Sequence, residues 1–406
     1  MAWTSLSVIA LLILSVSGPW VVAGATEQAA GGEQPTELQQ RIQQLRQEAE
    51  SKPDDASAQR ALGEALYLKG DEKAAIPPLK RAAALEPNNV RVLSTLGSAL
   101  FDTGQLAEAL PVLQRASELD PKSLAVLLDL GATLCAQGQL EQGSVPLRKA
   151  VELYPNDPRP QRSLGKAYIM LKRWSDALDL LMLTRSIDEW QPEVEEMLHY
   201  TARNGKGEFA AAVKANEKEA RAHGRLACAL FFEKTAQGKE ALAHIDRALA
   251  LDPTSAEFYA SKILILMTMG KDAELLSTAR ACTRAVPAGW VCHRELASGL
   301  LTAGKAPEAL EELLQADRLN PGVISVQSSL CFARAMLGDM DAARNACESA
   351  LSLGSGGGGD HMNLARVYFT LGQYAPALRQ ARIAEKMGIP HAKDLATDIE
   401  KKLAGR

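Results

Sequence analysis

The feature that most constrains this chain is a 34-residue segment that recurs along it. The stretch "LGEALYLKGDEKAAIPPLKRAAALEP" at 62–87 is followed by "LGSALFDTGQLAEALPVLQRASELDP" at 96–121. A fixed period of this length indicates an array of repeated supersecondary units, each of which buries its apolar face against its neighbours. The units begin at these residues: Ala56, Val90, Leu124, Pro158, then Ala222, Ala256, Trp290, Ile324 and Gly358.

Each unit has the pattern of two packed helices. Small residues recur at its eighth, twentieth and twenty-seventh places, as at Gly63, Ala75 and Ala82, which lets two helices approach closely. Larger apolar residues at places seven, eleven and twenty-four supply the buried area. Glycine at place fifteen favours the left-handed end of the first helix, and proline at place thirty-two stops the second. The glycines are Gly70, Gly104, Gly138, Gly270, Gly304, Gly338 and Gly372.

With these glycine, alanine and proline places, the units resemble tetratricopeptide repeats over residues 56–391. The resemblance implies an all-α fold, a right-handed α-solenoid superhelix of helix hairpins whose first helices line a concave face. The family's aromatic residue at place four is mostly absent, and Glu189 replaces one closing proline. Three prolines fall inside second helices, where we expect a lost hydrogen bond or a bend: Pro77, Pro111 and Pro146.

These patterns predict the domain organisation. The predicted segments are a signal peptide at 1–25, a flexible linker at 26–35, an N-terminal helix at 36–55, a first arm of four repeats at 56–191, a divergent repeat or hinge at 192–221, a second arm of five repeats at 222–391, and a capping helix at 392–406. The segment at 192–221 has two interpretations, a hinge between the arms or a divergent but fully packed repeat.

The N-terminus has the composition of an export signal. Residues 1–25 carry no charged side chain, and small residues at Ala23 and Ala25 predict cleavage before Thr26. We therefore expect an exported, periplasmic protein. The alternative is an uncleaved anchor that holds the chain at the membrane, since the apolar run is close to the length that spans a bilayer.

The N-terminal helix carries an apolar stripe of Leu38, Ile42 and Leu45. This stripe could cover the first repeat, or it could pair with a second copy and make a homo-oligomer. Both interpretations remain open at the level of sequence.

The sequence offers little for catalysis, metal or nucleic acid. The net charge is −4, which lacks the excess of lysine and arginine that binding to phosphate backbones needs. The six histidines are isolated, and no phosphate-binding loop or nucleophile elbow occurs. The chain is expected to be no enzyme, with no catalytic residues, no cofactor, no metal site and no nucleic-acid partner.

The six cysteines matter because an exported protein meets an oxidising compartment. Cys282 and Cys292 flank one turn, and Cys331 and Cys347 lie on facing helices of one hairpin, so both pairs could form disulfides. Alternatively, each cysteine is a small apolar residue in a close-packed place. Cys135 and Cys228 are expected to be unpaired.

Function is expected to lie on the concave surface, where repeat arrays bind a peptide or a partner helix. The predicted groove is an apolar strip that ends in positive charge: Tyr67, Leu68, Ser94, Ser98, Phe101, Leu128, Arg162, Lys166 and Ile169. Phe101 and Ile169 could instead pack between units. The carboxylate-clamp version of the family fits poorly, because Arg60 and Glu64 stand where lysine and asparagine are expected.

The sequence therefore predicts a non-enzymatic protein-interaction scaffold of the cell envelope whose partner is a protein or peptide. Two alternatives remain open. One is a membrane-tethered structural component that self-associates, and the other is a regulatory subunit of a separate enzyme.

Overall fold

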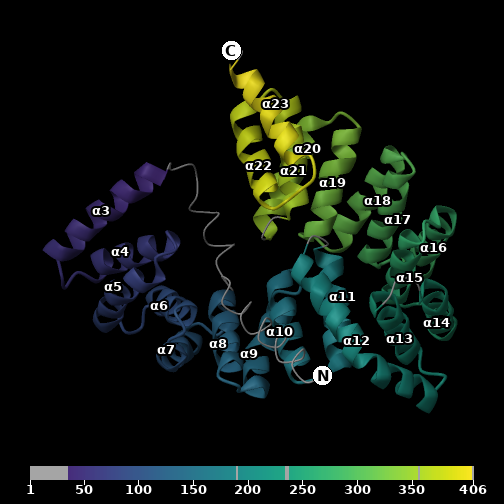
Figure 1. Ribbon diagram of the computed structural model, residues 1–406, viewed down its shortest axis with the longest axis horizontal. Helices are drawn as coiled ribbons and strands as arrows, with labels where there is room; N and C mark the ends of the chain where they lie inside the picture. Colours follow the sequence, from purple (N-terminus) through teal and green to yellow (C-terminus); the bar gives the residue numbers. More distant parts are fainter. Residues whose placement is uncertain (1–34, 189–190, 234–236, 355–356, 405–406) are drawn as a thin grey trace, which may run out of the picture. The chain divides into compact units, whose positions relative to one another are not determined.

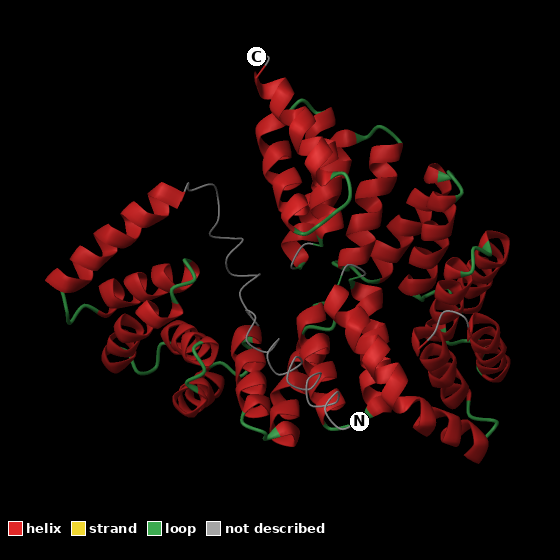
Figure 2. Cartoon of the chain, in the orientation of Figure 1, coloured by secondary structure: helices red, strands yellow, loops and turns green. Residues whose placement is uncertain are grey.

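The computed structural model describes residues 35–188, 191–233, 237–354 and 357–404, and within these ranges the chain contains helices and no strands (Figures 1 and 2). This confirms the predicted all-α solenoid. None of the described helices is both long and apolar enough to cross a membrane. The predicted signal peptide, its cleavage site and nearly all of the linker lie outside the described residues.

The chain divides into two compact units between Pro155 and Asn156. The first unit contains α3 (Pro35–Ser51), α4 (Ala56–Leu68), α5 (Glu72–Leu85), α6 (Val90–Asp102), α7 (Leu106–Leu119), α8 (Leu124–Ala136) and α9 (Leu140–Leu153). This division falls between the third and fourth predicted repeats. A hinge at 192–221 stays a prediction.

The second unit begins with α10 (Pro158–Met170), α11 (Trp174–Ile187), α12 (Pro192–Ala215), α13 (Ala220–Glu233), α14 (Gly238–Leu251), α15 (Ala256–Thr268) and α16 (Asp272–Ala285). It continues with α17 (Trp290–Thr302), α18 (Ala306–Leu319), α19 (Ile324–Met336), α20 (Met340–Leu353), α21 (Gly358–Thr370), α22 (Tyr374–Lys386) and α23 (Ala392–Ala404).

Turns inside the hairpins follow the predicted glycine rule. All seven place-fifteen glycines have positive φ, for example 82° at Gly70 and 80° at Gly338. Lys172 occupies this place in the hairpin of α10 and α11 and also adopts a positive φ, of 57°. A side chain with a Cβ atom is therefore held in a conformation that costs it energy.

Small residues at place eight are needed because the two helices of a hairpin touch there. A Cβ atom added at Gly63, Gly97 or Gly131 would lie within 2.6 Å of a leucine of the second helix. Those leucines, at place twenty-four, are almost fully buried: Leu79, Leu113 and Leu147. The second helices run through Pro77, Pro111 and Pro146 without a break, so each proline costs a backbone hydrogen bond and does not end the helix.

α3 covers the first hairpin. Ile42, Leu45 and Ala49 are buried in the same cluster as Leu62 and Leu66 of α4. The amide of Gln59 donates to the carbonyl of Ala49 at 2.9 Å and so satisfies an acceptor near the end of α3. The stripe proposed for self-association is therefore occupied within the chain.

The helix that begins the predicted unit at Ala222 starts two residues earlier, at Ala220. His223 Nε2 contacts the carbonyl oxygen of Glu217, six residues back, as His293 Nε2 contacts that of Pro287. The two histidines are thus structurally equivalent, and the register is shifted by two. The residues between α13 and α14, at 234–236, lie outside the described part of the chain.

α12 changes which helices line the inside of the second unit. It is a single 24-residue helix with Val194, Met197, Leu198 and Phe209 buried. α12 contacts α10, and α11 contacts α13. α11, the second helix of its hairpin, therefore lies beside α13, which is the first helix of the next hairpin. We call the helices α11, α13, α15, α17, α19 and α21 the inner row.

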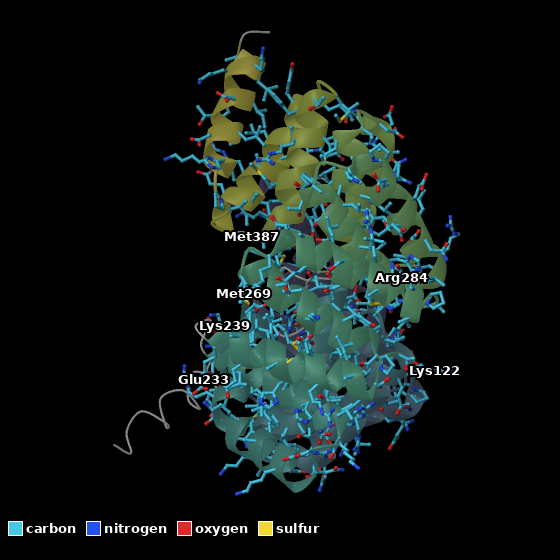
Figure 3. The ribbon with its side chains drawn as sticks, turned by 90° about the vertical axis from the view of Figure 1, so that its right-hand side faces the viewer. Lys122, Glu233, Lys239, Met269, Arg284 and Met387 are labelled. Carbon is cyan, nitrogen blue, oxygen red and sulfur yellow. A yellow bond between two sulfur atoms is a disulfide. The ribbon has the colours of Figure 1, made fainter. Side chains whose placement is uncertain are left out.

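The two edges of this unit hold different turns. Glu233, Lys239 and Met269, at turns within hairpins, lie along one edge, and Arg284, at a connection between hairpins, lies on the opposite side (Figure 3). The inner row therefore presents the beginnings of its first helices on one edge and their ends on the other.

Candidate functional site in the inner row

The predicted groove residues of the first unit mostly lie between helices. Phe101 is 6 % exposed and Leu128 is 1 % exposed, and Ser98 is also buried. Leu68, at 36 % exposure, is the most open of the set in this unit. These residues contribute more to packing between neighbouring repeats than to an open groove.

The polar members of that set belong to a hydrogen-bond network on α4, α6 and α8. The Tyr67 hydroxyl donates to Asp102 Oδ2 at 2.8 Å. Ser98 Oγ lies against both Asp129 Oδ2 and the carbonyl of Ser94, at 3.0 Å from the latter. Burial raises the pKa of Asp102, and it raises that of Asp129 to about 8.

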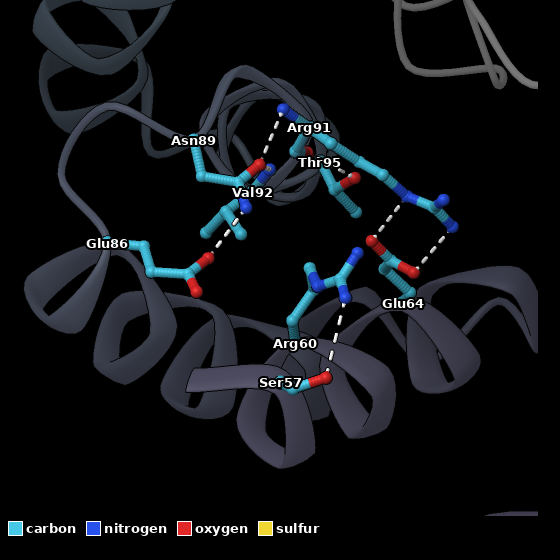
Figure 4. Close-up of polar contacts among 8 residues, drawn as sticks. All are labelled: Ser57, Arg60, Glu64, Glu86, Asn89, Arg91, Val92 and Thr95. Carbon is cyan, nitrogen blue, oxygen red and sulfur yellow. Dashed lines mark hydrogen bonds and ion pairs between the residues drawn. The ribbon is translucent and has the colours of Figure 1, made fainter. Parts of the chain in front are cut away.

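Glu64, which stands at a clamp position, is engaged within the chain (Figure 4). Arg91 donates to both of its carboxylate oxygens at 2.7 Å, while Arg60 donates to Ser57 Oγ at 3.5 Å. Asn89 caps α6 beside this pair by accepting from the backbone of Arg91 and Val92. A carboxylate ligand would meet Glu64 first, so the clamp geometry is absent here.

The remaining predicted groove residues lie on α10 in the second unit. Ile169 is buried. Lys166 forms an ion pair with Glu193 of α12, and Arg162 lies 3.4 Å from the same carboxylate. Burial lowers the pKa of Lys166, and Glu193 opposes that shift. The positive charges of Arg162 and Lys166 are thus neutralised by Glu193, which the repeat positions did not predict to lie near them.

The inner row lines a cavity in the described part of the second unit, which we call the main cavity. It has a volume of about 270 Å³ and lies between α11, α13, α15 and α17. Its apolar wall includes Met182 and Leu183 of α11, Phe258 of α15, and Trp290 and Val291 of α17. Leu183 is 40 % exposed, so this wall can be reached from solvent.

Charged residues at the rim of this cavity are partly paired. Arg225 donates to both oxygens of Asp179, at 3.0 and 2.6 Å, and this pair fixes α13 against α11. Arg221 and Glu257 also line the cavity. The site therefore has an apolar base and a rim of both charges, which suits a segment of protein chain.

A second cavity of about 210 Å³ follows along the row, between α15 and α17. Its lining includes Arg185 of α11, which donates to Glu195 of α12 at 2.7 Å, and Met267, which is half exposed. The inner row therefore offers successive hollows along its length.

The inner row curves so that its first helix, α11, contacts its fifth helix, α19. Ser325 Oγ donates to the carbonyl of Ser186 at 2.8 Å. The amides of Asn156 and Asn320 donate to each other at 2.8 and 3.1 Å. We call these contacts the closure contact. It brings together residues that the repeat pattern alone places four hairpins apart.

The cysteines lie in two bonded pairs and two single sites. Cys282 and Cys292 are disulfide-bonded with their Cα atoms 5.3 Å apart, and Cys331 and Cys347 are bonded with theirs 5.1 Å apart. Cys135 and Cys228 are free and buried. Cys228 lines the main cavity, and burial raises the pKa of its thiol to about 11.

Two histidines that are far apart in sequence meet in the second unit. His223 Nδ1 lies 2.9 Å from His244 Nδ1, and burial, followed by the charge of His223, lowers the pKa of His244. Among the described residues, no group of three or more histidine, cysteine or acidic side chains could hold a metal ion.

Two sequence models of the tetratricopeptide-repeat family match the chain, over residues 40–90 and 100–145. These matches fall on the hairpins whose helix starts and turn glycines repeat every 34 residues. The chain is a tetratricopeptide-repeat protein. As such a protein, it belongs with scaffolds that bind other proteins.

Solved structures similar to the tetratricopeptide-repeat chain include MamA, at 21 % identity over 37 % of this chain and 87 % of that one, with a TM-score of 0.35. A double mutant titled MamA RS-1 ArsTM is 25 % identical over the same shares, with a TM-score of 0.35. The anaphase-promoting complex assembly Cut9–Hcn1 is 13 % identical over 89 % of this chain and 87 % of that one, with a TM-score of 0.44. All three TM-scores are below 0.5, so the family assignment rests on the repeats.

A sequence comparison with curated proteins found no match.

The place numbering of the tetratricopeptide repeats missed the main cavity. Met182 and Leu183 lie on α11, a second helix that is expected to face outward. The signal was the 24-residue stretch at 192–215, which has no proline after its first residue and forms one helix where a hairpin needs two. Because α12 is one helix and not a hairpin, the second helix α11 takes the inner position that first helices hold in the hairpins after it.

Proposed function

We propose that this tetratricopeptide-repeat protein is an exported scaffold that holds an extended partner segment in the inner row of its second unit. The observation that carries the proposal is the main cavity, with its exposed Leu183 and its half-buried Trp290 and Val291. An aromatic residue in a partly open apolar hollow is a typical anchor point for a partner side chain. The rim charges would fix the register of the bound segment.

Export is supported by the uncharged apolar stretch at 1–25 and by the four cysteines that pair in the second unit. Disulfides persist in oxidising compartments, which include the periplasm. Expression of the full chain in a bacterial host tests this: the product in the periplasmic fraction should begin at Thr26. A product that keeps Met1 and stays with the membrane supports the anchored alternative and contradicts cleavage.

Binding can be tested without knowing the natural partner. A displayed library of random peptides is selected on the chain that begins at Thr26, and the affinities of the enriched peptides are measured by calorimetry. Trp290→Ala should weaken binding by about tenfold, because it removes the largest apolar wall of the cavity. Val145→Ala is the matched control, since Val145 is an exposed apolar residue of α9 in the first unit. Equal binding by wild type and Trp290→Ala contradicts the proposal.

A further inference from the structure

A second exposed apolar surface lies farther along the inner row, on α19 and on Leu337, the residue that follows this helix. Phe332, Met336 and Leu337 are 43 %, 46 % and 42 % exposed. Their spacing places Phe332 and Met336 on neighbouring turns of one helix face. Three large apolar side chains exposed together on a small area are typical of a surface that binds a partner.

A cavity of about 110 Å³ adjoins this face, between α19 and α21. Phe332 and Ala335 form one wall, and Arg366 and Thr370 of α21 form the other. Cys331 also lines the cavity and is bonded to Cys347 of α20, so the base of the cavity is covalently tied to the second helix of its hairpin. The hollow is therefore preformed and could receive one apolar side chain.

The lining of this cavity carries one positive charge. Arg366 is the charged residue among those that line the cavity, which includes no acidic side chain. Its side chain is exposed and makes no ion pair with any residue that the structure describes. Arg344 of α20 pairs with Asp341, and Arg382 of α22 pairs with Glu385 and Glu400.

We propose that the face of α19 and Arg366 together receive a partner segment that carries an apolar side chain and, about one helical turn away, an aspartate or glutamate. The apolar side chain enters the cavity beside Phe332, and the carboxylate accepts hydrogen bonds from the Arg366 guanidinium. Met336 and Leu337 cover the remaining apolar face of the segment. This inference rests on the proposed function and names the chemistry of the partner.

The test compares the peptides that wild type selects from a random library with those that two variants select. Wild-type peptides should combine an aromatic or large aliphatic residue with an acid. Arg366→Glu should replace that acid with lysine or arginine in the selected peptides, because the sign of the charge in the site is reversed. For individual wild-type peptides, Arg366→Ala should weaken binding by about tenfold. Arg379→Glu, an exposed arginine on the second helix of the same hairpin, should leave the selected sequences unchanged.

Phe332→Glu provides the second variant, and circular dichroism with thermal melting checks that each variant is folded. Loss of selection by folded Phe332→Glu supports the proposal. Identical peptides from wild type and Arg366→Glu overturn it. So does a native mass that falls from dimer to monomer in Phe332→Glu, since the face would then be covered by a second copy. If Trp290→Ala loses binding while both α19 and α21 variants keep it, the proposed function stands and this inference fails.

Discussion

Asp129 of α8 lies fully buried, and its Oδ1 atom has no hydrogen-bond partner among the described residues. Its Oδ2 atom contacts the hydroxyl of Ser98. Burial raises the pKa of this carboxyl to about 8, well above its usual range. In the folded chain the group holds its proton at neutral pH, whereas the same carboxyl in the unfolded chain loses its proton near pH 4.

This difference predicts how stability changes with pH. Between about pH 4 and about pH 8 the folded state binds one more proton at Asp129 than the unfolded state does, so this group makes the free energy of unfolding fall as pH rises. Asp129→Asn removes that dependence. It should raise the melting temperature more at about pH 8 than at about pH 5. Asp54→Asn is the control, because Asp54 has an exposed carboxyl. An equal change in melting temperature at both pH values would contradict this assignment.

Two glycines inside helices, Gly97 of α6 and Gly207 of α12, differ in how much space surrounds them. A Cβ atom at Gly97 would lie 2.4 Å from a side-chain carbon of Leu113, whereas one at Gly207 of α12 meets nothing within 4 Å. Gly97→Ala should therefore lower the free energy of unfolding by about 1–3 kcal/mol through overpacking. Gly207→Ala should raise it by up to about 1 kcal/mol, because alanine has the higher helix propensity. Urea unfolding of both variants measures the effects, and the same sign for both would refute the packing argument.

At the scale of the helical element, each hairpin whose turn the structure describes contains one left-handed residue in that turn. Seven hairpins use glycine at place fifteen, and the hairpin of α10 and α11 uses Lys172 at a φ of 57°. Non-glycine residues in this conformation cost about 1–2 kcal/mol. The substitution that relieves the cost is predictable from the neighbouring repeats.

Lys172→Gly should stabilise the second unit by about 1 kcal/mol, with no change in the helices on either side. Gly138→Lys, which installs the same strain in the hairpin of α8 and α9, should destabilise the first unit by a similar amount. Thermal unfolding of both variants provides the measurement. A loss of stability in Lys172→Gly would show that the lysine side chain makes a contact that outweighs the backbone strain.

At the scale of the whole molecule, the disulfides are confined to the second unit. Both Cys282–Cys292 and Cys331–Cys347 lie beyond Asn156, and the first unit contains one free cysteine, Cys135. Cross-links of this loop length stabilise a fold by about 3 kcal/mol. The two units should therefore respond differently to a reducing agent.

Reduction should lower the temperature at which residues 156–406 unfold and leave the first unit unchanged. Thermal melting with and without reductant detects the shift, and limited proteolysis followed by mass spectrometry assigns it to a unit. Cys331→Ala with Cys347→Ala should reproduce part of the shift without reductant. A matching shift in the first unit would contradict the assignment.

Much of this fold could be predicted from the sequence, since helix starts such as Val90 and Trp290 fall where the repeat places them. Local rules decide those positions. The start of α13 at Ala220, two residues before the predicted unit, was not predicted, because the 34-residue period placed that start at Ala222. The location of the main cavity was also missed, because α12 exchanges the rows. The Glu193 pairing and the closure contact depend on three-dimensional placement, which the period of the sequence does not encode.

The closure contact has a consequence for the order in which the second unit folds. Most contacts in this unit join neighbouring helices, which can form as soon as each hairpin leaves the ribosome. Ser186 and Ser325, however, are 139 residues apart, and Asn156 and Asn320 are 164 apart. α11 therefore cannot form the closure contact until α19 has been synthesised. The hairpins can fold in sequence, but the second unit is complete only after a late, long-range step, and a chain that ends before Asn320 would keep its helices while its inner row stayed open.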